Sequence, residues 1–217
     1  MKIDKTLVIT SVICLLPIVL GVLLYDRLPD MIAIHFNFVD APNSWGPKGL
    51  VVFGIPVFLC LLNILCNVVT KKYEKKDKNQ RMLLKFCRWM CAIISIVIVP
   101  VILFKALGAD IPIQIVAPVL VGVVLIIIGN YSPKTKQSRV AGIRIKWTLE
   151  SEENWRRTHR FAGYLWMLSG FVMIVTAFLM YYGFAYIWAA VFFGVIIAMI
   201  AAPVIYSYYL HRREVRN

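Results

Sequence analysis

The residues best suited to chemistry lie in the stretch 129–163, which reads GNYSPKTKQSRVAGIRIKWTLESEENWRRTHRFAG. Lys134 and Arg144 offer cationic groups that bind anions, and His159 offers a ring that titrates or donates a hydrogen bond near neutral pH. One interpretation is a polar pocket closed by Arg144, Trp147 and His159. The alternative is a structural staple, in which Arg144 binds carbonyls at a helix end and His159 fixes the loop. Both interpretations stay open at this point.

Sequence patterns of known enzyme classes are missing from the chain. It has no nucleophile elbow, no paired histidines at metal-ligand spacing and no glycine loop of the kind that cradles phosphate. We therefore expect no enzymatic activity, no cofactor and no metal site. A metal site of His35 with a nearby aspartate is a weak alternative, because the loop spacing is loose and no second histidine is close.

Six apolar segments must position these residues. The chain has 217 residues, of which 60% are hydrophobic and 16% charged, and its mean hydropathy is +0.76. A helix needs about 20 apolar residues to cross a bilayer, and only helices or closed barrels satisfy their backbone groups there. The segments are 6–25, 50–70, 87–107, 112–131, 161–182 and 184–208. We predict an all-α integral membrane protein, a bundle of six transmembrane helices.

The net charge of +13 is distributed unevenly over the two sides of this bundle. Of the 24 basic residues, 21 fall in the termini and in the connections of one side. Basic residues accumulate on the cytoplasmic side, so both termini are expected there, and the stretch 71–88 is interpreted as an orientation signal that also contacts anionic lipid. Topology and the lipid bilayer thus account for the charge, and we expect no direct nucleic acid binding.

Residues 26–49 form the longest connection on the opposite side. Their prolines and glycines predict an ordered, turn-rich cap rather than a long helix, and aromatic rings such as Trp45 suit the membrane interface. Lys105, at the outer end of the third span, is interpreted as a snorkelling side chain. Asn63 and Asn67 lie one turn apart and are expected to face another helix, because interhelical hydrogen bonds favour their burial.

A helix is predicted to start near residue 152 and to run without a break into the fifth span. Ser151 is a good N-cap, and the acidic side chains of Glu152 and Glu153 complement the helix dipole in the first turn. Glu152 with Arg156, and Glu153 with Arg157, are spaced to form ion pairs four residues apart.

Two groups of residues in the stretch 129–163 closely resemble the signature of the SdpI family. The first is Gly129-Asn130-Tyr131-x-Pro133-Lys134-x-Lys136, followed by Gly142-Ile143-Arg144 and Trp147-Thr148-Leu149, and the second is Trp155-x-x-Thr158-His159-Arg160 with Gly163. The outer connection, with Ile34-His35-Phe36-Asn37 and Trp45-Gly46-x-Lys48, resembles the uncharacterised extracellular-facing module that often precedes this signature. Together the two resemblances span nearly the whole chain.

The resemblance implies a multi-pass immunity protein of the bacterial plasma membrane, which protects its producer from a secreted antimicrobial peptide toxin. It also implies a receptor role, in which the protein sequesters a cognate ArsR-type repressor at the membrane. The family usually has Met where Ser132 stands, Asn where Ser138 stands, and Thr-Pro in place of Ile145-Lys146. The alternative function is a small membrane transporter or a lipid-modifying enzyme that uses the cytoplasmic-face pocket.

The resemblance also indicates where functional residues are expected. In the cytoplasmic signature loop they are Asn130, Tyr131, Pro133, Lys134, Lys136, Gly142, Arg144, Trp147, Thr148, Trp155, Thr158, His159 and Arg160. In the outer loop the expected toxin contacts are His35, Asn37 and Trp45. The predicted organisation has three parts: 1–70 with the first two spans and the outward loop 26–49, 71–128 with the basic loop and spans three and four, and 129–217 with the signature loop and spans five and six.

Overall fold

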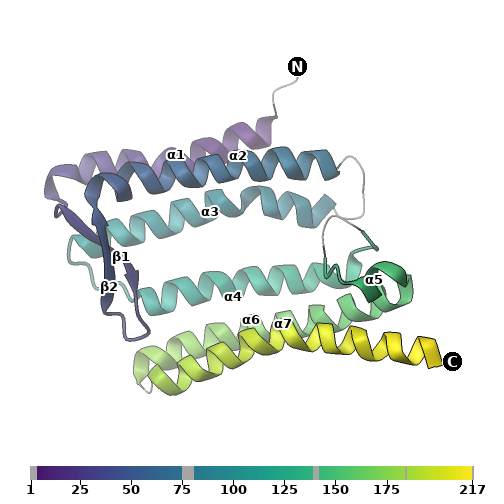
Figure 1. The fold of residues 1–217 in the computed structure, drawn as a ribbon. Coiled ribbons are helices and arrows are strands. Elements are labelled where there is room, and N and C mark those ends of the chain that lie inside the picture. The colour runs from purple at the N-terminus through teal and green to yellow at the C-terminus, as the bar shows by residue number, and fades with distance from the viewer. Residues whose placement is uncertain (1–3, 75–80, 139–141, 184, 217) are drawn as a thin grey trace. The chain divides into compact units, whose positions relative to one another are not determined.

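The computed structural model describes residues 4–74, 81–138, 142–183 and 185–216. Within these residues six helices are long and apolar enough to cross a membrane, which confirms the predicted number of spans. They are α1 (Lys5–Leu24), α2 (Ile55–Glu74), α3 (Arg81–Ala106), α4 (Ile113–Tyr131), α6 (Glu152–Tyr182) and α7 (Ala185–Arg216) (Figure 1). The other labelled elements are the strands β1 (Met31–Phe36) and β2 (Pro42–Pro47) and the short helix α5 (Lys146–Glu150).

The chain divides into two compact units. Unit 1 consists of Met1–Asp77 and Leu83–Ile113, so it contains α1, the two strands, α2 and nearly all of α3. Unit 2 consists of Lys78–Met82 and Gln114–Asn217, so it contains α4 to α7.

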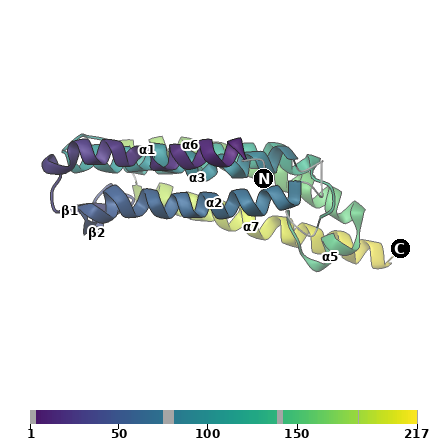
Figure 2. The same cartoon turned by 90° about the horizontal axis from the view of Figure 1, so that it is seen from above.

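In unit 1, α1 and α2 pack side by side, as two views at right angles show (Figures 1 and 2). The first helix begins after Asp4, whose carboxylate accepts a hydrogen bond of 3.1 Å from the backbone N–H of Thr6 and so caps the helix. An apolar core lies where β1, the short π-helix Leu50–Gly54 that leads into α2, and the end of α3 meet. Ile32, Val52 and Leu103 are almost completely buried in it. Burial of this core against the strands fixes the hairpin at one end of the helices.

The outward loop is ordered, as predicted, but it is a β-hairpin rather than a series of turns. β1 and β2 are antiparallel, with Ala33 opposite Trp45 and an irregularity in the register on each side of His35. Pro42 and Pro47 stand at the two ends of β2, where a missing backbone N–H interrupts the ladder least. The prediction of an all-α fold therefore holds for the spans and was wrong for this hairpin, whose short strands lack a clear apolar alternation.

In unit 2, α4 and α6 cross at two pairs of glycines. A Cβ atom on Gly170 would lie 2.4 Å from the carbonyl oxygen of Gly122, and one on Gly129 would lie 2.7 Å from that of Gly163. The glycines are seven residues apart on each helix, about two turns, so the two antiparallel backbones touch at successive levels. Without a hydrophobic driving force in lipid, such close backbone approach is a main source of helix association.

Helix α7 passes through Pro203 without ending there. A proline in a helix leaves the carbonyl four residues earlier without its usual donor, and that carbonyl belongs to Met199. The indole N–H of Trp166 on α6 donates to this oxygen at 3.1 Å. The neighbouring helix thus satisfies the freed carbonyl, which is how prolines in spans are expected to be tolerated.

Candidate functional site

The signature loop of unit 2 leads into α6 at the predicted residue. Ser151 caps the helix, since its Oγ accepts from the backbone N–H of Asn154 at 3.1 Å, and Oγ also donates to Glu214 on α7 at 3.1 Å. Glu153 pairs with Arg157 at 2.6 Å, as predicted. Arg156, which the sequence pairs with Glu152, instead binds Glu153 three residues earlier at 2.6 Å.

His159 is buried at the start of α6, with 1% of its surface exposed. Its ring stacks on Trp155, with centroids 3.9 Å apart. Because a carbonyl can only accept, Nδ1 carries the proton and donates to the carbonyl of Trp155 at 2.9 Å, and Nε2 accepts from the backbone N–H of Ile143 at 2.9 Å. Both ring nitrogens are therefore used by the chain itself, and the imidazole holds the loop against the helix.

Further hydrogen bonds tie the loop to the first two turns of α6. Ser132 donates to the carbonyl of His159 at 3.0 Å, and the indole N–H of Trp155 donates to the carbonyl of Thr135 at 2.9 Å. Thr148 is fully buried, and its hydroxyl donates to the carbonyl of Ile143 at 2.7 Å. The described part of the loop is thus a packed structure with internal hydrogen bonds.

Gly142 permits the contact between the loop and the histidine. Its φ of +120° belongs to a region that side chains rarely adopt. A Cβ atom here would lie 2.6 Å from Nε2 of His159 and 2.7 Å from the ring of Trp155. The glycine of the signature is therefore required both by the backbone conformation and by the lack of space for a side chain beside the rings of His159 and Trp155.

Arg144, Trp147 and His159, which the sequence could assign to one pocket, lie in different surroundings. Trp147 packs on α7, with its ring centroid 4.9 Å from that of Tyr208 and 6.1 Å from that of His211. Arg144 is exposed, whereas His159 is enclosed by the loop. The staple interpretation of His159 accounts for its contacts.

The remaining signature residues separate into an exposed and a buried set. The exposed residues are Asn130, Lys134, Lys136 and Arg160, while Tyr131 and Pro133 are half-buried and the ammonium of Lys134 lies 5.3 Å from the centre of the Tyr131 ring. Thr158 is buried and donates to Oδ1 of Asn154 at 3.0 Å. Asn154 also donates to the carbonyl of Ser207 on α7 at 2.9 Å and accepts from its hydroxyl at 2.6 Å, a polar contact that the sequence analysis missed.

The predicted outer contacts lie on the hairpin of unit 1. Asn37 shapes its turn, because Oδ1 accepts from the backbone N–H groups of Val39 and Ala41 at 3.1 and 2.9 Å. His35 on β1 bonds Asn43 on β2 at 2.6 Å, and Trp45 is 54% exposed. Of the three, Trp45 presents the largest apolar surface for a partner.

The tip of the hairpin is fastened to the end of α3 by an ion pair that the sequence did not indicate. Nζ of Lys105 lies 2.5 Å from Oδ2 of Asp40 and donates to the carbonyl of Ile111 at 2.8 Å, while Oδ1 of Asp40 accepts from the backbone N–H of Ile113 at 3.2 Å. Lys105 also lies over the Phe36 ring, 5.1 Å from its centroid. The interpretation of Lys105 as a snorkelling side chain was therefore wrong, because its charge is paired with Asp40 within the protein.

A cavity of about 230 Å³ lies between the hairpin and the end of α3. Met31, Phe36 and Trp45 contribute apolar walls from the strands, and Ile102 contributes from α3. Met31 is 51% exposed, so part of this apolar surface faces the surroundings of the protein. The arrangement suits the side chains of an apolar or amphipathic ligand better than a small polar one.

At the other end of unit 1 a buried ion pair joins α1 to α3. Arg88 is 7% exposed, and its Nη2 lies 2.5 Å from Oδ2 of Asp4. Its Nε donates to Oδ1 of Asn67 on α2 at 2.7 Å. Lys71 approaches the same carboxylate oxygen at 3.2 Å. Burial alone would raise the pKa of Asp4, but hydrogen bonds from Lys71 and Arg88 together with their charges hold this pKa below its ordinary value.

The two asparagines of α2 extend this polar contact toward the middle of the span. Asn67 donates to Oδ1 of Asn63 at 3.0 Å, and Asn63 donates to the hydroxyls of Thr10 and Ser11 on α1 at 3.0 and 3.1 Å. The expectation that both asparagines face another helix is confirmed. The assignment of Arg88 to a plain orientation signal was wrong, since its buried guanidinium bonds two other helices.

Two family matches cover separate parts of the chain. Residues 12–60, with most of α1, the hairpin and the start of α2, match a domain of unknown function (DUF1648). Residues 134–207, with the signature loop, α5, α6 and most of α7, match the SdpI/YfhL protein family. The part of the chain that forms unit 2 is thus similar to the SdpI/YfhL protein family. The predicted resemblance to the SdpI signature and to the module that precedes it is thereby confirmed. The six candidate spans of the described residues agree with a membrane protein.

Among curated proteins, the chain is similar to the immunity protein SdpI of Bacillus subtilis (strain 168). The two sequences are 29% identical over 174 residues, which cover 80% of this chain and 82% of that protein. No solved structure matches the chain significantly. Because neither unit holds as many as 174 residues, the alignment includes parts of both unit 1 and unit 2.

Proposed function

We propose that the chain is an immunity protein of the bacterial plasma membrane, which protects its cell from a secreted peptide toxin. In this proposal both termini and the signature loop lie in the cytoplasm, and the hairpin lies outside the cell. The uneven distribution of basic residues supports this orientation. Reporter fusions after residue 45 and after the C-terminus test it, because a reporter that is active only outside the cytoplasm should respond at the first position alone.

The apolar cavity of the hairpin carries the proposal of toxin binding. A peptide that attacks a membrane presents an apolar face to lipid, and the cavity lined by Trp45 offers an apolar surface that could receive this face. Lys105 lines this cavity, but Asp40 pairs with its charge, so the site does not repel a cationic peptide as strongly as a bare lysine would. Capture at the hairpin lowers the amount of toxin that reaches the bilayer.

Replacing Trp45 with Ala tests this role of the hairpin. Truncation of an aromatic anchor in an interface commonly costs about 1–2 kcal/mol or more, so the toxin concentration that the cell survives should fall about tenfold. Trp89→Ala is the matched control, because Trp89 is 37% exposed at the opposite end of unit 1. Survival and membrane potential are measured in a toxin-sensitive bacterium at equal membrane abundance of each variant. Full protection by Trp45→Ala would exclude toxin capture at the hairpin.

Variants of the two other outer residues distinguish a change in the shape of the hairpin from the loss of a direct contact with the toxin. Asn37→Ala removes both hydrogen bonds that shape the turn, so it should reduce protection by moving the hairpin tip. His35→Ala removes a single exposed bond to Asn43 and should have the smaller effect. Equal effects of both variants would indicate that the imidazole itself contacts the toxin.

A second proposed function is recruitment of a cytoplasmic ArsR-type repressor by the signature loop. The supporting observation is that the buried contacts of His159 and Thr148 fix a loop whose basic side chains, including Lys134 and Arg144, are exposed. Arg144→Ala should reduce co-fractionation of the repressor with membranes, whereas Arg156→Ala, which removes an exposed charge on α6, should not. Unchanged recruitment in both Arg144→Ala and His159→Ala would exclude the loop as the binding surface.

A further inference from the structure

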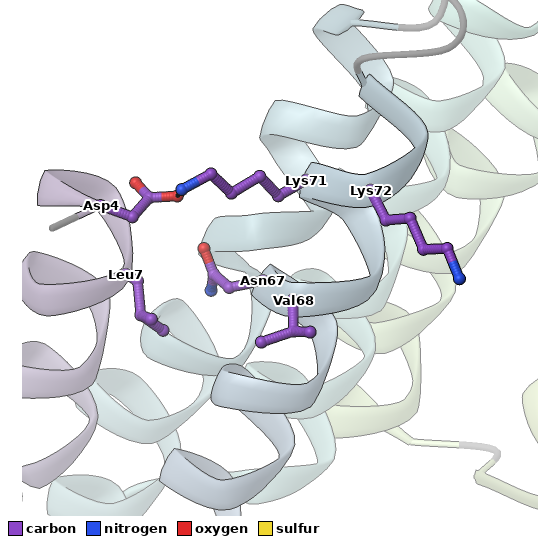
Figure 3. Close-up of a pocket in the computed structure, with 6 residues that line it drawn as sticks. All are labelled: Asp4, Leu7, Asn67, Val68, Lys71 and Lys72. Atoms are coloured by element: carbon purple, nitrogen blue, oxygen red, sulfur yellow. Dashed lines mark ion pairs between the residues drawn. The ribbon is translucent and has the colours of Figure 1, made fainter. Parts of the chain in front are cut away.

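A cavity of about 390 Å³ opens between α1 and α2 in unit 1, at the end that carries the buried ion pair. Leu7 and Val68 contribute apolar walls, and Lys71 and Lys72 lie at its rim (Figure 3). This cavity is at the opposite end of the helices from the hairpin, so it belongs to neither of the sites described above.

The charges around this cavity favour an anion. Three cations, Arg88, Lys71 and Lys72, lie at or beside it, and among the described lining residues Asp4 is the single acidic one. Both oxygens of that carboxylate already accept hydrogen bonds, one from Thr6 and the other from Arg88. Lys71 shares the carboxylate of Asp4 with Arg88. Figure 3 shows the ammonium of Lys72, the second lysine of the lining, turned away from Asp4. The rim therefore keeps an excess of positive charge.

The position of the cavity along the helices indicates a lipid. Asp4 immediately precedes the apolar span of α1, and Lys71 and Lys72 lie within the last turn of the span of α2. The cations therefore lie at the level of the lipid headgroups, and the apolar walls below them lie at the level of the first acyl carbons. Val68 is 57% exposed, so the wall is open to a chain from the surrounding bilayer.

We propose that this cavity binds an anionic phospholipid, with the phosphate at Lys71 and Lys72 and the upper part of an acyl chain against Leu7 and Val68. Basic pockets between transmembrane helices are a recurrent way to bind acidic lipid headgroups. The bound lipid shields the excess charge of the rim and fills the space between α1 and α2. This site is independent of toxin binding, so its test does not depend on immunity.

The test uses the purified full chain in detergent, titrated with dioleoyl phosphatidylglycerol or with dioleoyl phosphatidylcholine, and bound lipid is counted by native mass spectrometry. Phosphatidylglycerol should bind more tightly. Lys72→Gln should weaken its binding about fivefold, the effect of one lysine near an anionic headgroup. The matched control is Lys85→Gln, which removes one exposed charge from α3 of the same unit without touching the cavity. Equal binding of the two lipids, or equal effects of the two variants, would overturn the proposal.

Two further arms separate a lipid from free phosphate and from diffuse attraction. Val68→Phe puts a larger side chain in the apolar wall of the cavity, where Val68 is exposed. It should weaken the binding of phosphatidylglycerol with no change of charge. Sodium phosphate in tenfold excess over lipid, at constant ionic strength, should leave the bound phosphatidylglycerol unchanged. Displacement by sodium phosphate, or full binding by Val68→Phe, would show that the acyl chain contributes nothing and would refute the lipid assignment.

Discussion

Replacing Asp4 with Asn is expected to destabilise unit 1 by about 3 kcal/mol. The change removes the negative charge that faces Arg88 and leaves the side chain nearly the same in size. The guanidinium stays buried, with 8% of its side chain exposed, so water cannot solvate it in place of the lost carboxylate. The destabilisation therefore arises from the loss of a carboxylate beside a buried charge rather than from a cavity.

The magnitude follows from the contacts that remain. Removal of one partner of a buried ion pair commonly costs about 3–5 kcal/mol. The lower end applies here, because Arg88 keeps its hydrogen bond of 2.7 Å to Asn67. Lys71 loses the same carboxylate, but its side chain is 46% exposed and water replaces the contact. Nearly all of the expected change therefore comes from Arg88.

Thermal unfolding of the purified chain measures the effect. Asp30→Asn is the matched control, because it breaks an ion pair with Lys48 in which the side chain of Asp30 is 92% exposed, and the melting temperature should not change measurably. The double variant Asp4→Asn with Arg88→Gln should be more stable than the sum of the two single losses predicts. Equal melting temperatures for Asp4→Asn and Asp30→Asn would refute the reasoning.

The same pair predicts a dependence on pH. The pKa of Asp4 is lower in the folded protein than its ordinary value of about 4. A lowered pKa contributes stability that is fully present above the unfolded value and is lost as the pH falls through the folded value. Below about pH 4 the difference in melting temperature between the natural chain and Asp4→Asn should therefore shrink. A constant difference down to pH 2 would contradict the assignment of the effect to this carboxylate.

Two further substitutions test unit 2. Gly142→Ala should lower the free energy of unfolding by about 3 kcal/mol, because it adds backbone strain at a positive φ and displaces the hydrogen bond to His159. The control is Gly194→Ala, in a helix with open space around it, which should be neutral or slightly stabilising in the same thermal assay. Trp166→Phe should cost about 1–2 kcal/mol, because the carbonyl of Met199 then lacks a donor inside the span, and an unchanged melting temperature would show that another group satisfies it.

The sequence predicted the features that depend on neighbouring residues and missed the contacts between distant ones. Hydropathy located the spans, and the cap at Ser151 located the start of α6, because both are local properties. Arg88 lies in a basic stretch, so its burial could be known only from Asp4, which is 84 residues away in the chain. Lys105 and Asp40 are likewise 65 residues apart, and nothing in the composition of either neighbourhood indicates the pair.

In the signature loop, the sequence predicted which residues matter to the resemblance but not which of them face inward. His159 and Thr148 are chemically suited to bind a ligand, and the structure commits both to the backbone of Ile143. The glycines of α4 and α6 carried a readable signal that the sequence analysis did not use. Their seven-residue spacing puts both glycines of each helix on one face, and small residues on a helix face let two backbones approach closely.

The two ion pairs of unit 1 have a mechanical consequence, because they are anchored on one helix. Arg88 and Lys105 are both on α3 and are separated by 17 residues, so a rise of 1.5 Å per residue places them about 26 Å apart. α3 is therefore held at both ends, by the hairpin at one end and by the start of α1 at the other. A force that pulls the hairpin away from Lys105 breaks the ion pair with Asp40 and frees one end of α3, while the ion pair of Arg88 with Asp4 still holds the other end.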